Sequence, residues 1–194
     1  MSDLDRKKWN SRYAEGAYAR RTQPSELLVN AVEDWPEQAG RALDIACGAG
    51  RNALYMAERG FQVTAMDISD QALDGARRTA VERHLTVQWL EQDLDELTEL
   101  DGVFGLICMV RYVNAPLLNL AVQSLAPEGL LVVEQHLRTE AAVIGPNNPV
   151  FRVAPGELGR QAVGLELIYH FEGVTTDPDG RRVALARLIA RRAD

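Results

Sequence analysis

The apolar residues in the first part of the chain follow two spacings, which predict two kinds of element. Short, mostly apolar runs are typical of strands, whereas apolar residues three and four apart are typical of helices. We therefore expect strands at 41–46, 61–66 and 85–91 and helices at 51–59 and 69–83. Strands that alternate with helices in this way predict a parallel sheet with helical crossovers.

The same alternation continues into the middle of the chain. Two very apolar runs, 103–109 and 130–136, predict buried central strands, and the segment from about 116 to 125 predicts a helix between them. Residues 94–100 are too few and too acidic for more than a turn or two of helix. Pro127-Glu128-Gly129 predicts the turn that leads into the last of these strands.

The final third of the chain changes character. Apolar and polar residues alternate over 165–172 and 183–191, on either side of the turn Asp177-Pro178-Asp179-Gly180, and a short helix is expected near 155–163. This pattern predicts an antiparallel hairpin. Together with the five earlier strands it predicts an α/β fold, with a doubly wound, mainly parallel sheet of seven strands that ends in the hairpin.

Two helical patterns precede the first strand, at 3–14 and 24–35, and the second has Pro24 in its first turn and ends before Pro36. They could cover the edge of the sheet where a ligand binds. The length suits one domain. We divide it into a helical cover at 1–36, a ligand-binding core at 41–137, and a lid with the hairpin at 138–194.

Composition narrows the range of partners. The 194 residues carry a formal net charge of −7, which opposes binding to nucleic acid or to an anionic membrane surface. Cys47 and Cys108 have no spacing typical of a metal site or a disulfide framework. No run approaches the length of a membrane span, and the polar start lacks the apolar core of a secretion signal. We therefore expect a cytoplasmic protein, as a monomer or homodimer.

A glycine-rich turn after the first strand is the most specific feature of the chain. Gly48 and Gly50 remove side chains, so that the backbone can approach a ligand and turn tightly into the next helix. Asp44 precedes this turn, and Asp67 ends the next strand, where a carboxylate can accept hydrogen bonds from ribose hydroxyls. Asp67 could instead cap a helix, but Ser69 is a plausible cap there. This arrangement favours a nucleoside ligand.

Taken together, these residues resemble the S-adenosylmethionine site of class I methyltransferases, and the expected fold resembles theirs over nearly the whole chain. The segment Trp9-Asn10-Ser11-Arg12-Tyr13 also resembles the first helix of small bacterial methyltransferases of the methyltransferase-25 and tellurite-resistance type, which folds over the methionine end of the cofactor. The resemblance implies cofactor contacts from Trp9, Tyr13, Asp44, Ala46, Gly48, Asp67, Ile68, Asp93, Leu94 and Met109.

Some of these residues have a second interpretation. Trp9 and Tyr13 lie four residues apart on one helical face, which describes two core anchors against the sheet equally well. Arg12 points off that face, toward either the cofactor carboxylate or solvent. Asp93 is expected to accept from the exocyclic amine of adenine, while Leu94 packs on the ring or pairs with it through its backbone.

Two other functions fit the same pattern. Gly48 and Gly50 followed by Ala53 approximate the fingerprint of an NAD-dependent dehydrogenase. Asp44 argues against that function, because a carboxylate at the loop would repel a pyrophosphate and attract the ammonium group of S-adenosylmethionine. A module that binds S-adenosylmethionine or S-adenosylhomocysteine without turnover is the other alternative.

Methyl transfer from a sulfonium needs mainly alignment and exclusion of water, so a small-molecule methyltransferase requires no fixed catalytic signature. The residues that follow the fourth and fifth strands face the expected acceptor. They include Arg111, Tyr112 and Asn114, then His136, whose ordinary pKa near 6.5 makes it the best candidate for a general base. A polar residue at the end of a strand, without a chemical role, is the alternative for His136.

The segment 145–152 interrupts the fold and could form a lid, in which Phe151 supplies an aromatic face. A simple solvent loop is the alternative. Arg111, Arg138 and Arg152 surround this mouth and would suit a small anionic acceptor such as a carboxylate, a thiolate or a metalloid oxyanion.

Overall fold

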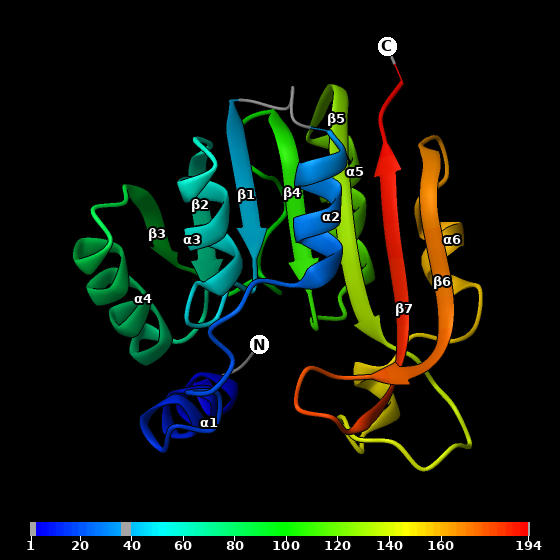
Figure 1. Ribbon diagram of the computed structural model, residues 1–194, viewed down its shortest axis with the longest axis horizontal. Coiled ribbons are helices and arrows are strands. Elements are labelled where there is room, and N and C mark those ends of the chain that lie inside the picture. Colours follow the sequence, from blue (N-terminus) through cyan, green and yellow to red (C-terminus); the bar gives the residue numbers. More distant parts are fainter. Residues whose placement is uncertain (1–2, 36–39, 194) are drawn as a thin grey trace.

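Seven strands form one sheet, and residues 3–35 and 40–193 are described by the computed structural model (Figure 1). The strands are β1 (Arg41–Ile45), β2 (Gln62–Asp67), β3 (Val87–Glu91), β4 (Phe104–Val110), β5 (Leu125–His136), β6 (Glu166–Thr176) and β7 (Arg182–Arg191). Their order is β3-β2-β1-β4-β5-β7-β6. Strands β1 to β5 pair in parallel, while β7 runs antiparallel to both β5 and β6. The expected fold, a doubly wound, mainly parallel sheet with a C-terminal antiparallel hairpin, is confirmed.

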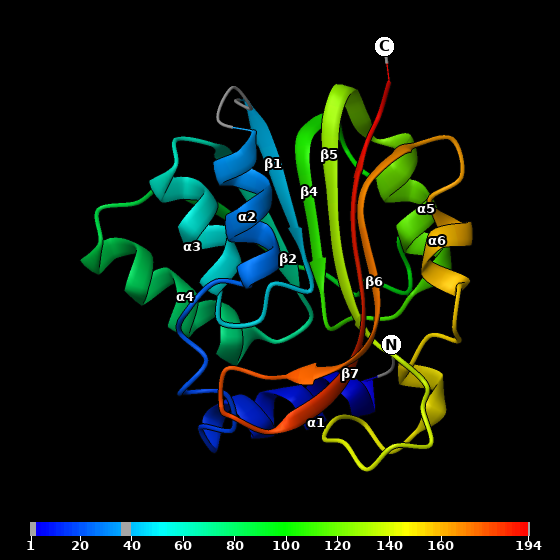
Figure 2. The ribbon, with the colours of Figure 1, turned by 45° about the vertical axis from the view of Figure 1, so that its right-hand side comes forward.

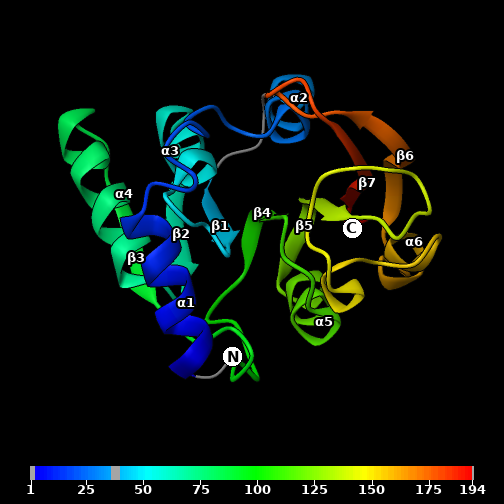
Figure 3. The same ribbon diagram turned by 90° about the horizontal axis from the view of Figure 1, so that it is seen from below.

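Helices cover both faces of this sheet. They are α1 (Asp3–Ala14), α2 (Glu26–Asp34), α3 (Arg51–Glu58), α4 (Asp70–Glu82), α5 (Ala115–Gln123), α6 (Glu157–Gln161) and a 3-10 turn at Pro149–Phe151. Helices α2 and α3 lie on one face and α5 and α6 on the other (Figure 3). Each face has its own buried cluster, with Leu28 and Met56 on the first and Leu118 and Leu158 on the second. Burial of apolar side chains on both sides explains why the central strands are apolar throughout.

The parallel strands end at one edge of the sheet, which is the lower edge in Figure 1. Asp44 of β1 lies beside Ala65 of β2 and Cys108 of β4, so the loops that follow these strands come together. Helix α1 lies beyond this edge, outside the two helical layers (Figures 1 and 2). Ligands of open α/β sheets bind at this edge, where the order of the strands reverses.

The structure corrects three local predictions. Helix α2 begins at Glu26, so Pro24 precedes the helix, and Pro36 lies outside the described residues. Pro127-Glu128-Gly129 lies inside β5 as an irregularity in its pairing with β4, where Glu128 has a φ of 60°. Helix α6 is shorter than expected because its helical residues stop at Gln161. The cap of α4 is confirmed, because the hydroxyl oxygen of Ser69 accepts from the backbone N–H of Ala72 at 3.2 Å.

Among the helices of the described residues, we find none that combines the length and apolar character of a membrane span.

Candidate cofactor and acceptor site

The loop between β1 and α3, residues 46–50, is the glycine loop. Ala46 has a φ of 58°, Gly48 of 55° and Gly50 of 79°, so the backbone is left-handed at three of its five residues. A Cβ atom on Gly48 would lie 2.3 Å from the hydroxyl oxygen of Tyr13, and one on Gly50 would lie 2.6 Å from the ring of Trp89. Both glycines are therefore required by conformation and by space.

Asp67 connects the end of β2 to this loop. One carboxylate oxygen accepts from the backbone N–H of Gly48 at 2.8 Å, and the other accepts from the N–H of Ser69 at 2.9 Å. The side chain is buried, and burial raises its pKa although both hydrogen bonds oppose the shift. Each carboxylate oxygen can accept a second hydrogen bond. Asp67 therefore holds the loop and retains acceptor capacity for a pair of hydroxyl groups.

Asp44 is buried beside the start of α3. It is 1% exposed, and one of its oxygens accepts from the backbone N–H of Ala53 in the first turn of α3, at 3.0 Å. Burial raises its pKa to about 7, against the hydrogen bond from Ala53. Repulsion of the pyrophosphate of NAD requires this carboxylate at the mouth of the loop, whereas Asp44 is buried and bonded to Ala53. The carboxylate of Asp44 thus bonds to the backbone at the start of α3, directly after the glycine loop, and its contact with a cofactor stays a prediction.

Helix α1 covers the loop without being part of the core. None of its 12 residues is buried. It is held by the hydrogen bond between Ser69 and Asn10, at 2.7 Å, and by an ion pair between Arg6 and Glu91. The interpretation of Trp9 and Tyr13 as core anchors is therefore wrong.

The two aromatic residues of α1 have different surroundings. Tyr13 lies over Gly48, and its ring is 5.2 Å from the ring of Tyr18, while Trp9 packs on Tyr18 at 6.2 Å. Tyr13 is partly covered, and its partial removal from water raises the pKa of its hydroxyl, which therefore stays protonated and can donate a hydrogen bond. The exposed Arg12 contacts the hydroxyl of Tyr18 and lies near the ring of Trp9.

The expected adenine contacts lie beside Asp67 but are largely covered. Ile68 and Leu94 are 3% and 1% exposed, and Leu94 packs in the cluster beneath α5 and α6. Met109 lies within β4, and its side chain is wholly inaccessible, so its backbone is the part that can meet a ligand. Asp93 is half-buried and accepts from the N–H of Asp95 at 3.0 Å.

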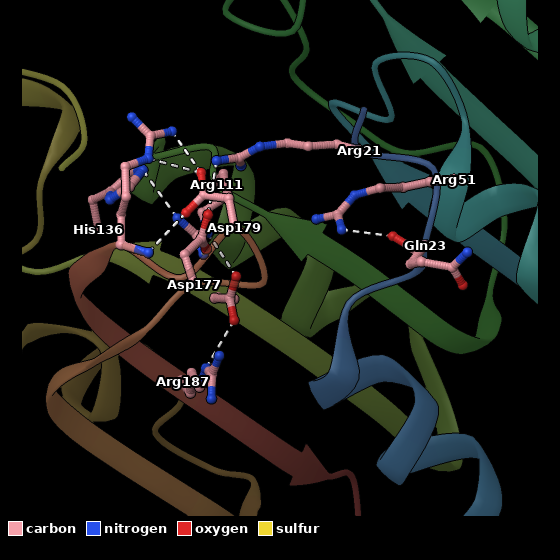
Figure 4. A network of polar contacts seen from close by, with 10 residues as sticks. Arg21, Gln23, Arg51, Arg111, His136, Asp177, Asp179 and Arg187 are labelled. Atoms are coloured by element: carbon pink, nitrogen blue, oxygen red, sulfur yellow. Dashed lines mark hydrogen bonds and ion pairs between the residues drawn. The ribbon is translucent and has the colours of Figure 1, made fainter. Parts of the chain in front are cut away.

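A network of arginines and carboxylates occupies the neighbouring part of the edge, where an acceptor was expected (Figure 4). Glu134 of β5 is 3% exposed and accepts from Arg111 at 2.6 Å and from Arg187 at 2.8 Å. Asp177 of the hairpin is 5% exposed and accepts from Arg111 at 2.7 Å and from Arg21 at 2.9 Å. These five residues, which we call the arginine network, join four parts of the chain.

Arg111 is the centre of this network. Its φ of 62° places it in the left-handed region directly after β4, as Ala46 is placed directly after β1. Such backbone conformations cost energy in residues other than glycine and persist where the surroundings enforce them. Here the guanidinium bonds to Glu134 and Asp177, while the N–H of Arg111 donates to the carbonyl oxygen of Glu134 at 2.6 Å.

The structure brings His136 to Arg111 but separates Tyr112 from them. An N–H of Arg111 lies 3.4 Å from Nε2 of His136. Burial, then Arg111 and Arg152, lower the pKa of His136 to about 4. The expectation of a base with a pKa near 6.5 is therefore wrong, since neutral His136 is a weak base here. Tyr112 points elsewhere and donates to Asp95 at 2.9 Å.

The other expected acceptor residues have structural partners. Asn114 caps α5 by accepting from the N–H of Leu117 and donates to Asp95 at 2.7 Å. The guanidinium of Arg152 donates to the carbonyls of Pro146, Leu137 and Ile144, and exposed Arg138 donates to the carbonyls of Pro149 and Arg152. Arg138 and Arg152 thus hold segment 138–154 together, and the expected group of three arginines around an anion stays a prediction.

Reasoning from the sequence missed five residues near this edge, namely Arg21, Arg51, Glu134, Asp177 and Arg187. One signal was available, because Glu134 interrupts the apolar run Leu130-Leu131-Val132-Val133. A carboxylate within a buried strand requires a cation or hydrogen-bond donors. The identity of those partners depends on the tertiary structure.

Comparisons with known proteins agree with this site. A family profile described as a methyltransferase domain matches residues 42–129, which include Asp44, the glycine loop and Asp67. YqeM of Bacillus subtilis is 33% identical over 140 residues, which cover 63% of this chain and 56% of YqeM. The chain spans about half the length of the relatives that it matches in sequence.

Two solved structures share the fold. TehB from Haemophilus influenzae superposes with a TM-score of 0.74 at 21% identity, over 85% of this chain and 61% of TehB. Magnesium protoporphyrin IX methyltransferase from Synechocystis PCC 6803, with bound S-adenosylhomocysteine, superposes with a TM-score of 0.71 at 16% identity, over 98% of this chain and 99% of that one. The profile match over residues 42–129, the strand order and the glycine loop agree with one another, and they resemble the domain and fold of class I S-adenosylmethionine-dependent methyltransferases.

Proposed function

We propose that this protein transfers a methyl group from S-adenosylmethionine to a small-molecule acceptor. The observation that carries the proposal is the hydrogen bond of 2.8 Å between the N–H of Gly48 and Asp67, inside the segment that matches the methyltransferase domain. It joins a bare backbone loop to a carboxylate at the end of the adjacent strand. These are the two elements that a nucleoside carrying an amino acid requires.

The chain offers separate groups for each part of the donor. The carboxylate of Asp67 can accept from the ribose hydroxyls, and the carbonyl of Ala46, a residue of the glycine loop, can accept from the ammonium group. Asp93, Ile68 and Leu94 surround the place for the adenine. In this proposal residues 41–137 hold the donor, while residues 1–36 and 138–194 cover it. Residues 1–2, 36 and 194 of these covering segments lie outside the described residues.

Catalysis then consists of alignment and exclusion of water. Bound S-adenosylmethionine supplies a methyl group on a cationic sulfur, which the acceptor atom displaces as the carbon–sulfur bond breaks. Tyr13 and α1 cover the loop from outside, and Asp177 of the hairpin covers the ends of β4 and β5. The low pKa of His136 keeps its ring neutral and makes it a weak base. His136 therefore suits a hydrogen bond to the acceptor molecule better than removal of a proton from that molecule.

The arginine network supports an anionic acceptor. Arg21, Arg111 and Arg187 carry three positive charges, whereas Glu134 and Asp177 carry two negative charges. An acceptor with a carboxylate or a similar anion would balance the remaining charge in a place with limited access to water.

Binding of the donor is tested by thermal shift with S-adenosylmethionine, S-adenosylhomocysteine and NAD. A ligand that binds the folded state alone raises the unfolding temperature. We expect a rise with the first two, and a much smaller rise in Asp67→Ala. Asp74→Ala removes an exposed carboxylate from α4 and should keep the full rise. A rise with NAD alone would support the dehydrogenase instead.

Turnover is tested separately from binding. The protein is incubated with S-adenosylmethionine and a mixture of small carboxylic acids, thiols and phenols, and release of S-adenosylhomocysteine is measured. We expect release that depends on the acceptor mixture. Binding without any release in such mixtures would favour a module that holds the cofactor without turnover.

A further inference from the structure

Strand β6 is an open edge of the sheet. It is the last strand in the order, at the right of the sheet in Figure 1, and it pairs with β7. In a strand that is paired on one side, about half of the backbone N–H and C=O groups point outward. Among the described residues, the structure records no hydrogen bond from the backbone of β6 other than those with β7. The outer edge of β6 is therefore available to another strand.

The opposite edge of the sheet is β3, which is protected in ways that β6 is not. Strand β3 has five residues, whereas β6 has 11. The exposed side chains of β3 are polar, and Glu91 forms an ion pair with Arg6 of α1. Strand β6 instead exposes three large apolar side chains, since Leu167, Tyr169 and Val174 are 48%, 40% and 38% exposed. Short strands and charged side chains oppose pairing with another chain, whereas a long apolar edge favours it.

The side chains of β6 alternate between the two faces of the sheet after an irregularity at residue 168. Tyr169, Phe171 and Gly173 lie on the face that α2 covers, and His170 and Glu172 lie on the face of α5 and α6. One face of the edge therefore carries an aromatic ring and a glycine. The other face carries a histidine and a carboxylate, neither of which is fully buried.

We propose that β6 pairs with β6 of a second copy of this chain, antiparallel, about a two-fold axis that passes through the sheet at Phe171. An axis perpendicular to the sheet keeps each face continuous, so residues that lie opposite each other come from the same face. In this register His170 of each copy lies opposite Glu172 of the other. Tyr169 of each copy lies opposite Gly173 of the other, and the symmetry forms both contacts twice.

The residues of β6 favour this register over its neighbours. A centre at Glu172 would place two carboxylates directly opposite each other, which destabilises a strand pair. A centre at Gly173 would place two glycines opposite each other and Glu172 opposite the apolar Val174. A centre at His170 would place the irregular start of β6 opposite Glu172. With the centre at Phe171, a histidine N–H can donate to each carboxylate, and each tyrosine ring can cover a glycine.

A strand of a different protein is the alternative occupant of this edge. The second copy is favoured because one short segment of this chain supplies both members of every complementary pair. A self-complementary surface is what a two-fold symmetric dimer requires.

The first test measures mass. Light scattering after gel filtration gives the mass of the full-length protein over a series of concentrations, and we expect the wild type to approach twice the mass of one chain. Tyr169→Lys removes the ring and adds a charge to the edge, so the dissociation constant of the dimer should rise about tenfold or more. Val81→Lys makes the same kind of change on α4, at a residue that is 74% exposed, and should leave this constant unchanged.

The second test measures the register by cross-linking. Phe171→Cys places two cysteines opposite each other at the axis, with their Cα atoms about 4.5–5.5 Å apart, which suits a disulfide. Val174→Cys places them about 20 Å apart along the strands. Cys47 and Cys108 are buried and should not compete. With a mild thiol oxidant we expect a covalent dimer of Phe171→Cys, but not of Val174→Cys, on a non-reducing gel. An unfolding curve for each variant shows that the fold is kept.

Three results would overturn the proposal. If the wild type keeps the mass of one chain at every concentration, β6 binds no second copy, and a strand of a different protein becomes the better occupant. If Tyr169→Lys leaves the dissociation constant unchanged, the dimer uses another surface. If Val174→Cys cross-links as well as Phe171→Cys, the register is wrong. These measurements need no S-adenosylmethionine, so their outcome is independent of the proposed function.

Discussion

Glu134 is the most informative residue to replace, because it is a buried carboxylate bonded to two guanidinium groups. Its side chain is 4% exposed, and those of Arg111 and Arg187 are 14% and 16% exposed. Glu134→Met keeps the approximate volume and removes the charge. The variant leaves Arg187 without the carboxylate it bonds to, while Arg111 keeps its bond to Asp177.

The stability that Glu134→Met is expected to lose follows from the exposed fractions of these three side chains. Removal of one partner from a buried ion pair costs about 3–5 kcal/mol. The remaining contact of Arg111 and the partial exposure of both arginines favour the lower end, about 3 kcal/mol. For a protein of this size that corresponds to a fall of about 6–12 °C in the unfolding temperature. It is a large part of a typical stability of about 5–15 kcal/mol.

Urea unfolding at pH 7, followed by circular dichroism, measures the loss. Glu134→Met is compared with Asp74→Ala, which breaks an exposed pair with Arg77 and should cost about 0.5 kcal/mol or less. The double variant Glu134→Met with Arg187→Met should recover part of the loss, because the uncompensated charge is gone. If Glu134→Met unfolds at the same urea concentration as Asp74→Ala, the network does not stabilise the fold and the reasoning is refuted.

Three further outcomes are expected. Burial raises the pKa of Glu134, but Arg111 and Arg187 outweigh burial and hold this pKa below 4.5. The stability that Glu134 contributes is therefore present above pH 4.5 and is lost as the pH falls through the lower pKa of the folded state. Urea midpoints measured down to pH 3 should show this loss in the wild type and lack it in Glu134→Met. The pKa of His136 is about 4 in the folded state against an ordinary value of 6.5, so the unfolded state binds more protons between these pH values and the free energy of unfolding falls on acidification. In His136→Asn the free energy of unfolding should fall less steeply from pH 7 to pH 5. An unchanged slope of this free energy against pH would contradict the low pKa of His136. Gly48→Ala should weaken S-adenosylhomocysteine binding at least tenfold, measured by calorimetry, because the added Cβ atom meets Tyr13. Gly60→Ala is the control, since Gly60 has a φ of 89° and nothing lies within 4 Å of its added Cβ atom. This control should lose about 1 kcal/mol of stability and keep its affinity for S-adenosylhomocysteine.

The sequence by itself was sufficient for the order and type of the elements. The helix expected at 51–59 is observed at Arg51–Glu58, and the hairpin about Asp177 is observed between β6 and β7. These predictions succeed because spacing of apolar residues is a local property that burial on one or both faces imposes. Gly48 was predictable for a similar reason, since a positive φ and close approach at a turn both require the absence of a side chain.

Only the tertiary structure decided what the charged residues do. Asp44 was expected at a ligand and is turned inward to Ala53, because a nearby helix start supplied a backbone donor that spacing along the chain does not reveal. The pKa of His136 depends on burial and on arginines at distant positions in the sequence. The arginine network joins residues as far apart as Arg21 and Asp177, which are 156 positions apart. Electrostatic interactions act between groups that the fold brings together, so they depend on packing across the whole sheet and leave no periodic signal along the chain.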